Sequence, residues 1–172
     1  ALIGTHATGK TTICYELVAE LKKRGVNAEH LVEIAREAPK AGFRLNKGTT
    51  RDSQSWILHT QIARELEFGT RPDIEFLVCD RSVLDNYIYY INQFGRNHVL
   101  DCMVNEHVKT YALLFKIPIN PLYLKSDNFR STDALFQMRI DALLDIELMN
   151  REICFQNYIS VGQTIESILG KK

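Results

Sequence analysis

One short motif near the start of the chain strongly limits what the chain can fold into. Residues 4–11 match the pattern GxxxxGK[ST], with the sequence Gly4-Thr5-His6-Ala7-Thr8-Gly9-Lys10-Thr11. An apolar segment precedes this motif and an amphipathic segment follows it, which is the strand and helix context that a phosphate-binding loop requires. The glycines let the backbone turn sharply and bring its N–H groups close to phosphate oxygens. The motif therefore predicts a loop that binds a nucleoside triphosphate.

The fixed positions of this loop have separate physical roles. The helix that begins near Lys10 directs the positive end of its dipole at the phosphates. Lys10 is expected to reach the β and γ phosphates, and the Thr11 hydroxyl is placed to coordinate Mg²⁺. We therefore expect ATP, or another nucleoside triphosphate, and Mg²⁺ as cofactors. The residues expected to hold the nucleotide are Gly4, Thr5, His6, Ala7, Thr8, Gly9, Lys10, Thr11 and Thr12.

Composition favours a single globular domain over residues 1–172. Basic and acidic residues number 21 each. A net charge of zero disfavours a nucleic-acid partner, because proteins that bind phosphate backbones usually carry a basic excess. The four cysteines form no CxxC pair, as expected for buried thiols in a reducing compartment. No apolar run is long enough to span a membrane and no signal peptide is visible, so we expect a cytoplasmic location and no membrane partner.

Short apolar runs alternate with longer amphipathic segments, a pattern typical of α/β proteins. Apolar residues at helical spacing predict helices over residues 10–24, 52–68, 82–94, 98–115, 133–150 and 161–169. Strands are predicted over residues 1–3, 28–34, 76–79, 119–124 and 153–159. The predicted fold is an α/β fold with a parallel sheet of about five strands and helices on both faces.

An aspartate follows the compact apolar run over residues 76–79. Because the carboxyl ends of parallel strands open onto the ligand crevice, Asp80 is expected to lie beside the phosphate loop. There it would hold Mg²⁺ together with Thr11, or accept a proton from an attacking hydroxyl. The alternative is that Asp80 caps the helix that starts near Ser82. The phosphate loop upstream favours the functional interpretation.

Glu33 ends the second predicted strand in the same way, with Arg36 shortly after it. Both residues are expected at the rim of the same crevice, although solvated charges on a turn are an equally good interpretation. Arg81, next to Asp80, would either bridge to a substrate phosphate or pair with a carboxylate.

A polar segment from residue 126 leads into the predicted helix over residues 133–150 and carries Arg130, while Arg139 lies on the helix itself. A cation that closes over the site would stabilise a transferring phosphoryl group and exclude water, so residues 126–139 are expected to form a small lid. An ordinary surface loop is the alternative. A group of aromatic side chains at helical spacing is expected in the core rather than in a binding site: Trp56, Tyr87, Tyr89, Tyr90 and Phe94.

These motifs give the chain a family resemblance along nearly its whole length. It resembles the P-loop kinases of nucleosides and nucleotides, in particular the ribosylnicotinamide kinase domain of bifunctional NAD-biosynthesis regulators, and related AAA-like ATPases. The residues that carry the resemblance are the loop through Thr12, Glu33-Ile34-Ala35-Arg36-Glu37, Asp80-Arg81-Ser82 and Asp127-Asn128-Phe129-Arg130. The Asp80-Arg81 pair is similar to the DR or ER motif of thymidylate and deoxynucleoside kinases.

The resemblance implies a three-layer α/β fold of the P-loop NTPase kind, in which the strand before the loop lies beside the strand that ends in Asp80. It also implies a small acceptor bound between Glu33, Arg36 and Arg81. We therefore expect an ATP- and Mg²⁺-dependent phosphotransferase that acts on a nucleoside or nucleotide, with Lys10, Asp80, Glu33 and Arg130 as its catalytic residues. A nucleotide-dependent regulatory ATPase or switch without a small-molecule acceptor is the alternative. The sequence leaves the oligomeric state open, a homodimer included.

Overall fold

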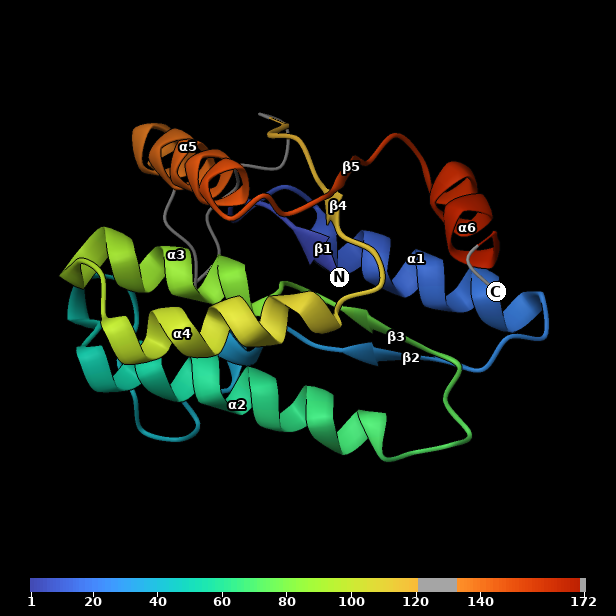
Figure 1. The fold of residues 1–172 in the computed structure, drawn as a ribbon, viewed down its shortest axis with the longest axis horizontal. Coiled ribbons are helices and arrows are strands. Elements are labelled where there is room, and N and C mark those ends of the chain that lie inside the picture. Colours follow the sequence, from blue (N-terminus) through green and yellow to red (C-terminus); the bar gives the residue numbers. More distant parts are fainter. Residues whose placement is uncertain (121–132, 171–172) are drawn as a thin grey trace.

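The computed structural model describes residues 1–120 and 133–170, in which helices lie on both faces of a parallel sheet (Figure 1). The strands are β1 Leu2–Ile3, β2 Ala28–Leu31, β3 Phe76–Cys79, β4 Phe115–Lys116 and β5 Gln156–Asn157. The α-helices are α1 Lys10–Lys23, α2 Arg51–Gly69, α3 Val83–Phe94, α4 His98–His107, α5 Ala134–Asn150 and α6 Val161–Leu169. Among these helices, none is both long and apolar enough to cross a membrane.

The five strands form two groups, β1-β4-β5 and β2-β3, and the strands within each group pair in parallel. The pair β2-β3 meets the group β1-β4-β5 through a bridge between Leu2 and Asp80. At this junction the Arg81 N–H donates to the Leu2 carbonyl oxygen at 3.2 Å. The prediction of a three-layer α/β fold with five strands is thus confirmed, and β1 does lie beside the strand that leads into Asp80.

Two groups of helices cover the two faces of the sheet (Figure 1). On one face α1 and α6 pack together over an apolar cluster that includes Leu17, Leu21 and Ile165. On the other face α3 is the central helix, with α2, α4 and α5 packed around it, and its Tyr87 and Ile88 are fully buried. Burying one such side chain stabilises a protein by about 1.5–3 kcal/mol, so these two clusters hold the layers together.

Polar caps fix where the helices around the site begin. Thr50 accepts a hydrogen bond from the Ser53 N–H at the start of α2, and Ser82 does the same for Asp85 at the start of α3. Asp133 accepts from the N–H groups of Leu135 and Phe136 at the start of α5. A cap of this kind contributes about 1 kcal/mol by satisfying donors that the helix leaves open, so the local sequence sets these boundaries.

The prediction was wrong for the fourth strand. Helix α4 ends at His107, a 3₁₀ turn follows over Val108–Thr110, and β4 lies at Phe115–Lys116, where the predicted helix was expected to end. This apolar segment fits between β1 and β5, where the Ile117 N–H donates to the Ile3 carbonyl oxygen at 2.8 Å. Periodicity alone cannot separate a short buried strand from the continuation of a helix. Residues 119–120 are not strand, and residues 121–124 lie outside the described residues.

Candidate functional site

The predicted phosphate loop runs from the end of β1 to the start of α1, at the carboxyl edge of the sheet. Gly4 has φ +140° and Gly9 has φ +86°, backbone angles that residues other than glycine rarely adopt. A Cβ atom on Gly4 would also lie 2.9 Å from the carbonyl oxygen of Ile117. The loop therefore requires glycine at position 4 for both its backbone angle and its close approach to the segment after β4.

A buried carboxylate ties this loop to the start of α3. Asp85 Oδ1 accepts the Gly4 N–H at 2.8 Å, and Oδ2 accepts the Ser82 N–H at 2.9 Å and the Ser82 hydroxyl at 2.6 Å. Sequence analysis missed Asp85. Its signal was present, because Ser82 and Asp85 have the three-residue spacing of a capping box. The cap of α3 and the position of the loop thus depend on one side chain.

Lys10 lies in the centre of the loop and is buried. Its Nζ donates to the Gly4 carbonyl at 2.9 Å, to the Thr8 hydroxyl at 3.1 Å and to the Thr5 carbonyl. Burial, and to a lesser extent the nearby positive charge of Arg81, lower the pKa of Lys10 to about 8, although neighbouring carboxylates oppose the shift. The ammonium group therefore lies within the loop, held by three of the loop's oxygen atoms, and an anion bound beside it would favour its charged form.

Thr11 and Asp80, the two residues predicted to hold a metal, lie side by side at the edge of the loop. The Thr11 hydroxyl donates to Asp80 Oδ2 at 2.5 Å, and Asp80 is 1% exposed. Two hard oxygen donors side by side suit Mg²⁺, which proteins hold through one or two side chains together with waters and phosphate oxygens. The alternative that Asp80 caps the following helix is wrong, because Ser82 is the N-cap of α3.

Glu33 lies between two arginines. Its Oε1 accepts from Arg81 Nε at 2.7 Å and its Oε2 accepts from Arg36 Nε at 3.0 Å. The Arg81 guanidinium also lies 4.9 Å from the centre of the Tyr89 ring, and its buried Nη1 has no hydrogen-bond partner among the described residues. Arg81 has φ +90°, a strained backbone conformation that places its side chain between Glu33 and Tyr89. Of the two predicted roles for Arg81, the pairing with a carboxylate is the one observed.

A cavity of about 520 Å³ opens beside the loop at His6. Glu33 and Arg81 line it, and so do side chains from α2, α3 and the start of α5. Among the polar ones, Asn86 is buried and its Nδ2 lacks a hydrogen-bond partner within the described part of the chain. Gln54, from α2, donates to the Thr49 hydroxyl at 2.8 Å. The cavity thus borders the loop through His6 and is otherwise formed by other segments of the chain.

Aromatic rings form the boundary between the loop and the cavity. The His6 N–H donates to the Tyr89 hydroxyl at 3.2 Å, and the His6 ring lies 5.5 Å from the ring of Phe136. Gln137, the next residue in α5, donates to the His6 carbonyl at 2.7 Å. Tyr89 packs against the core cluster of α3, as predicted, but it also lines the cavity, whereas Tyr87 is fully buried.

The remaining predicted residues lie at the margin of this arrangement. Arg36 contacts Glu33 but is not among the residues that line the cavity, and its side chain is 37% exposed. Arg139, from α5, does line the cavity. Arg130 and the expected lid segment 126–132 lie outside the described residues. The rest of the expected lid, from Asp133, is the capped beginning of α5.

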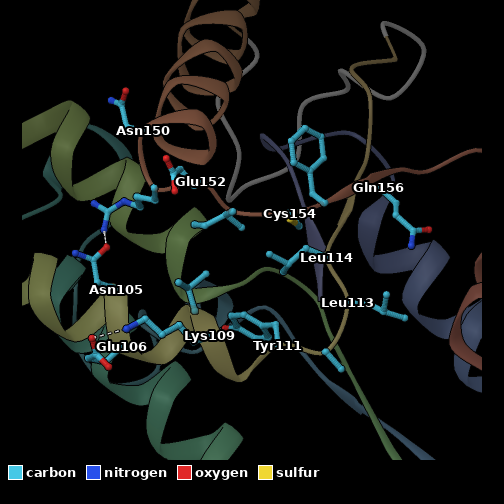
Figure 2. Close-up of a pocket in the computed structure, with 15 residues that line it drawn as sticks. Asn105, Glu106, Lys109, Tyr111, Leu113, Leu114, Asn150, Glu152, Cys154 and Gln156 are labelled. Atoms are coloured by element: carbon cyan, nitrogen blue, oxygen red, sulfur yellow. Dashed lines mark hydrogen bonds and ion pairs between the residues drawn. The ribbon is translucent and has the colours of Figure 1, made fainter. Parts of the chain in front are cut away.

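A larger hollow, of about 690 Å³, lies near the amino ends of β4 and β5. Figure 2 shows its walls, with Asn105, Glu106 and Lys109 on one side and Asn150 and Glu152 on the other. Two of its charged groups, Lys109 and Glu106, are paired with each other at 2.7 Å. Because this hollow is at the edge of the sheet opposite the phosphate loop, it is not part of the candidate site.

A glycine-bounded loop between β1 and α1, a central buried lysine and an acid on the neighbouring strand define a P-loop nucleotide-binding domain. The comparison with known families narrows this class. The chain belongs to a family described as AAA domain, whose profile matches residues 1–163. No curated protein matches the chain.

Solved structures of deoxyadenosine kinase from M. mycoides are similar to this chain. One, described with the products dCMP and a flexible dCDP bound, has a TM-score of 0.65 and 17% identity. Another, described with bound dCTP, has a TM-score of 0.60 and 16% identity. Both alignments cover 99% of this chain and 96% of the kinase. At this identity the similarity establishes the fold.

Proposed function

We propose that this protein transfers the terminal phosphoryl group of ATP to a nucleoside or nucleotide. One observation carries the proposal: the phosphate loop borders a cavity of about 520 Å³, which Glu33 and Arg81 line. A volume of this kind is in the usual range for a small-molecule site. A regulatory ATPase would need the loop but no such compartment, so the cavity favours a kinase over the switch alternative.

The lining of the cavity supports a nucleoside as the acceptor. Tyr89 and Phe136 offer flat apolar surfaces for a ring, and the side-chain amides of Gln54 and Asn86 offer donors and acceptors for the edge of a base. The Nη1 of Arg81, which has no hydrogen-bond partner among residues 1–120 and 133–170, is available for a hydroxyl or phosphate oxygen of the acceptor. The similar solved structures are named as deoxyadenosine kinases, which is consistent with this class of substrate.

The geometry suggests a division of work between the two acids. Glu33 lines the cavity and would accept the proton of the acceptor hydroxyl. The oxygen of that hydroxyl would attack the γ phosphorus of ATP while the bond from this phosphorus to the oxygen that bridges the β and γ phosphates breaks. Lys10 would stabilise the negative charge of the transferring group. Thr11 and Asp80 would hold Mg²⁺, which supplies further charge neutralisation on the phosphates when bound. Arg130 and Arg139, from the expected lid, are proposed to stabilise the negative charge of the transferring phosphoryl group.

An ATP-consumption screen tests this proposal. ATP, Mg²⁺ and the purified protein are incubated with single nucleosides, nucleotides and nicotinamide riboside, and phosphorylated product is detected by mass spectrometry. At least one acceptor should give product, and Lys10→Ala should remove nearly all of this activity while circular dichroism stays unchanged. Lys23→Ala, which removes an exposed lysine at the other end of α1, is the matched control.

The outcomes separate the two functions. Product formation that depends on both the acceptor and Lys10 supports the kinase. Slow ATP hydrolysis that no acceptor changes would instead favour the regulatory ATPase, and full activity in Lys10→Ala would refute the mechanism.

A further inference from the structure

Helix α5 has apolar side chains on two opposite sides. Its inner side packs against α3 through buried residues that include Ile140, Leu144 and Leu148. Its outer side exposes four large apolar side chains: Leu135 at 78%, Met138 at 59%, Ile146 at 49% and Met149 at 76%. A surface helix normally has one apolar side and one polar side, so the outer side needs an explanation.

The exposed residues form one continuous stripe. At about 100° of rotation per residue, all four lie within about 40° of a line through Ala142, which is itself exposed. The stripe, defined here as Leu135, Met138, Ala142, Ile146 and Met149, runs along nearly the whole of α5. The nearest charged residues, Arg139 and Asp145, lie on its two flanks rather than within it.

We propose that the stripe is a dimer interface, on which the α5 helix of a second copy of this chain packs in the antiparallel direction. A two-fold axis at Ala142 places Leu135 level with Met149 of the second copy, and Met138 level with Ile146 of the second copy. The small side chain of Ala142 then lies at the crossing point, where it allows the two helices to approach closely. The stripe is self-complementary in length and in chemistry, as a two-fold interface requires.

The exposed area supports a second copy as the occupant. Four large side chains at these exposures present on the order of 500 Å² of surface, within the size range in which patches on monomers are often functional. Two such stripes together would remove roughly 1,000 Å² from solvent, which is the lower limit for a specific interface. The expected complex is therefore a dimer with a dissociation constant in the micromolar range rather than a permanent one.

Sedimentation equilibrium, measured at several protein concentrations in the micromolar range, tests whether the interface forms. The wild-type chain should show a reversible monomer–dimer equilibrium. The double variant Met138→Asp/Ile146→Asp places like charges in the interface and should raise the dissociation constant at least about a hundredfold. Val99→Asp is the matched control, because Val99 is 71% exposed on α4, outside the stripe. Circular dichroism should show that all variants remain folded, since each change is at an exposed position.

Cross-linking tests the position of the two-fold axis independently. In a Cys102→Ser/Cys154→Ser background, which removes the exposed thiols, Ala142→Cys should form a disulfide-linked dimer under mild oxidation. Leu66→Cys, on the exposed side of α2, should not. A strictly monomeric wild type would overturn the proposal. So would a dimer that survives the double variant or dissociates equally with Val99→Asp, or cross-linking through Leu66→Cys instead of Ala142→Cys.

Discussion

Raising the pH from 7 to 9 should weaken the binding of Mg·ATP to this protein by about tenfold. The pKa of Lys10 in the free protein is lowered to about 8, chiefly by burial. The protonated fraction of Lys10 therefore falls from about nine-tenths at pH 7 to about one-tenth at pH 9. A bound polyphosphate favours the ammonium form, so binding must take up a proton wherever the free protein has lost it. The loss of affinity corresponds to about 1.4 kcal/mol.

Isothermal titration calorimetry in two buffers with different ionisation enthalpies measures this directly. Uptake of about half a proton per bound nucleotide is expected at pH 8, and close to one at pH 9. The triphosphate itself contributes little there, because its last ionisation lies near pH 6. Lys23→Ala should leave the profile unchanged. Equal affinity at pH 7 and 9, with no proton uptake, would refute the claim that Lys10 titrates in this range.

Three substitutions extend these expectations. Gly4→Ala should lower the free energy of unfolding by about 1–3 kcal/mol in urea titrations, because the new methyl group meets the Ile117 carbonyl oxygen at 2.9 Å; no change would mean that the loop has another conformation. Glu33→Gln should reduce kcat by at least about a hundredfold at saturating ATP, and a normal kcat would exclude Glu33 as the base. Asp85→Ala should destabilise the fold by about 2 kcal/mol, measured by thermal unfolding, because Gly4 and Ser82 lose the buried carboxylate to which they donate; an unchanged Tm would contradict this.

Local sequence predicts the positions of two parts of the candidate site. The loop residues 4–11 lie between a strand and a helix as expected, and Asp80 meets Thr11 at the end of β3. Both features depend on short motifs whose geometry is fixed by neighbouring residues. The position of β1 next to β3 followed from the family resemblance rather than from periodicity, and it is confirmed by the bridge between Leu2 and Asp80.

The features that depend on contacts between distant segments were not predicted. Tyr89 was expected in the core, but its hydroxyl reaches the backbone of His6, 83 residues earlier in the chain. Phe136 and Gln137 meet the same loop from α5, and no local pattern marks them. The segment around Phe115 was expected to be helical because its apolar run fits either a helix or a strand. It forms a strand because it pairs between β1 and β5, which are distant in the sequence.

The shared role of Asp85 affects how loss-of-function data on this protein should be interpreted. A screen for inactive variants would return Asp85 among the residues that seem to contact nucleotide, because its loss releases the Gly4 backbone. Yet both oxygens of this carboxylate are already occupied by protein donors from Gly4 and Ser82. Only a parallel measurement of folding would separate such an anchoring residue from a true ligand contact. Engineering that aims to change the preference for the proposed acceptor should accordingly leave position 85 alone and begin with the walls of the cavity.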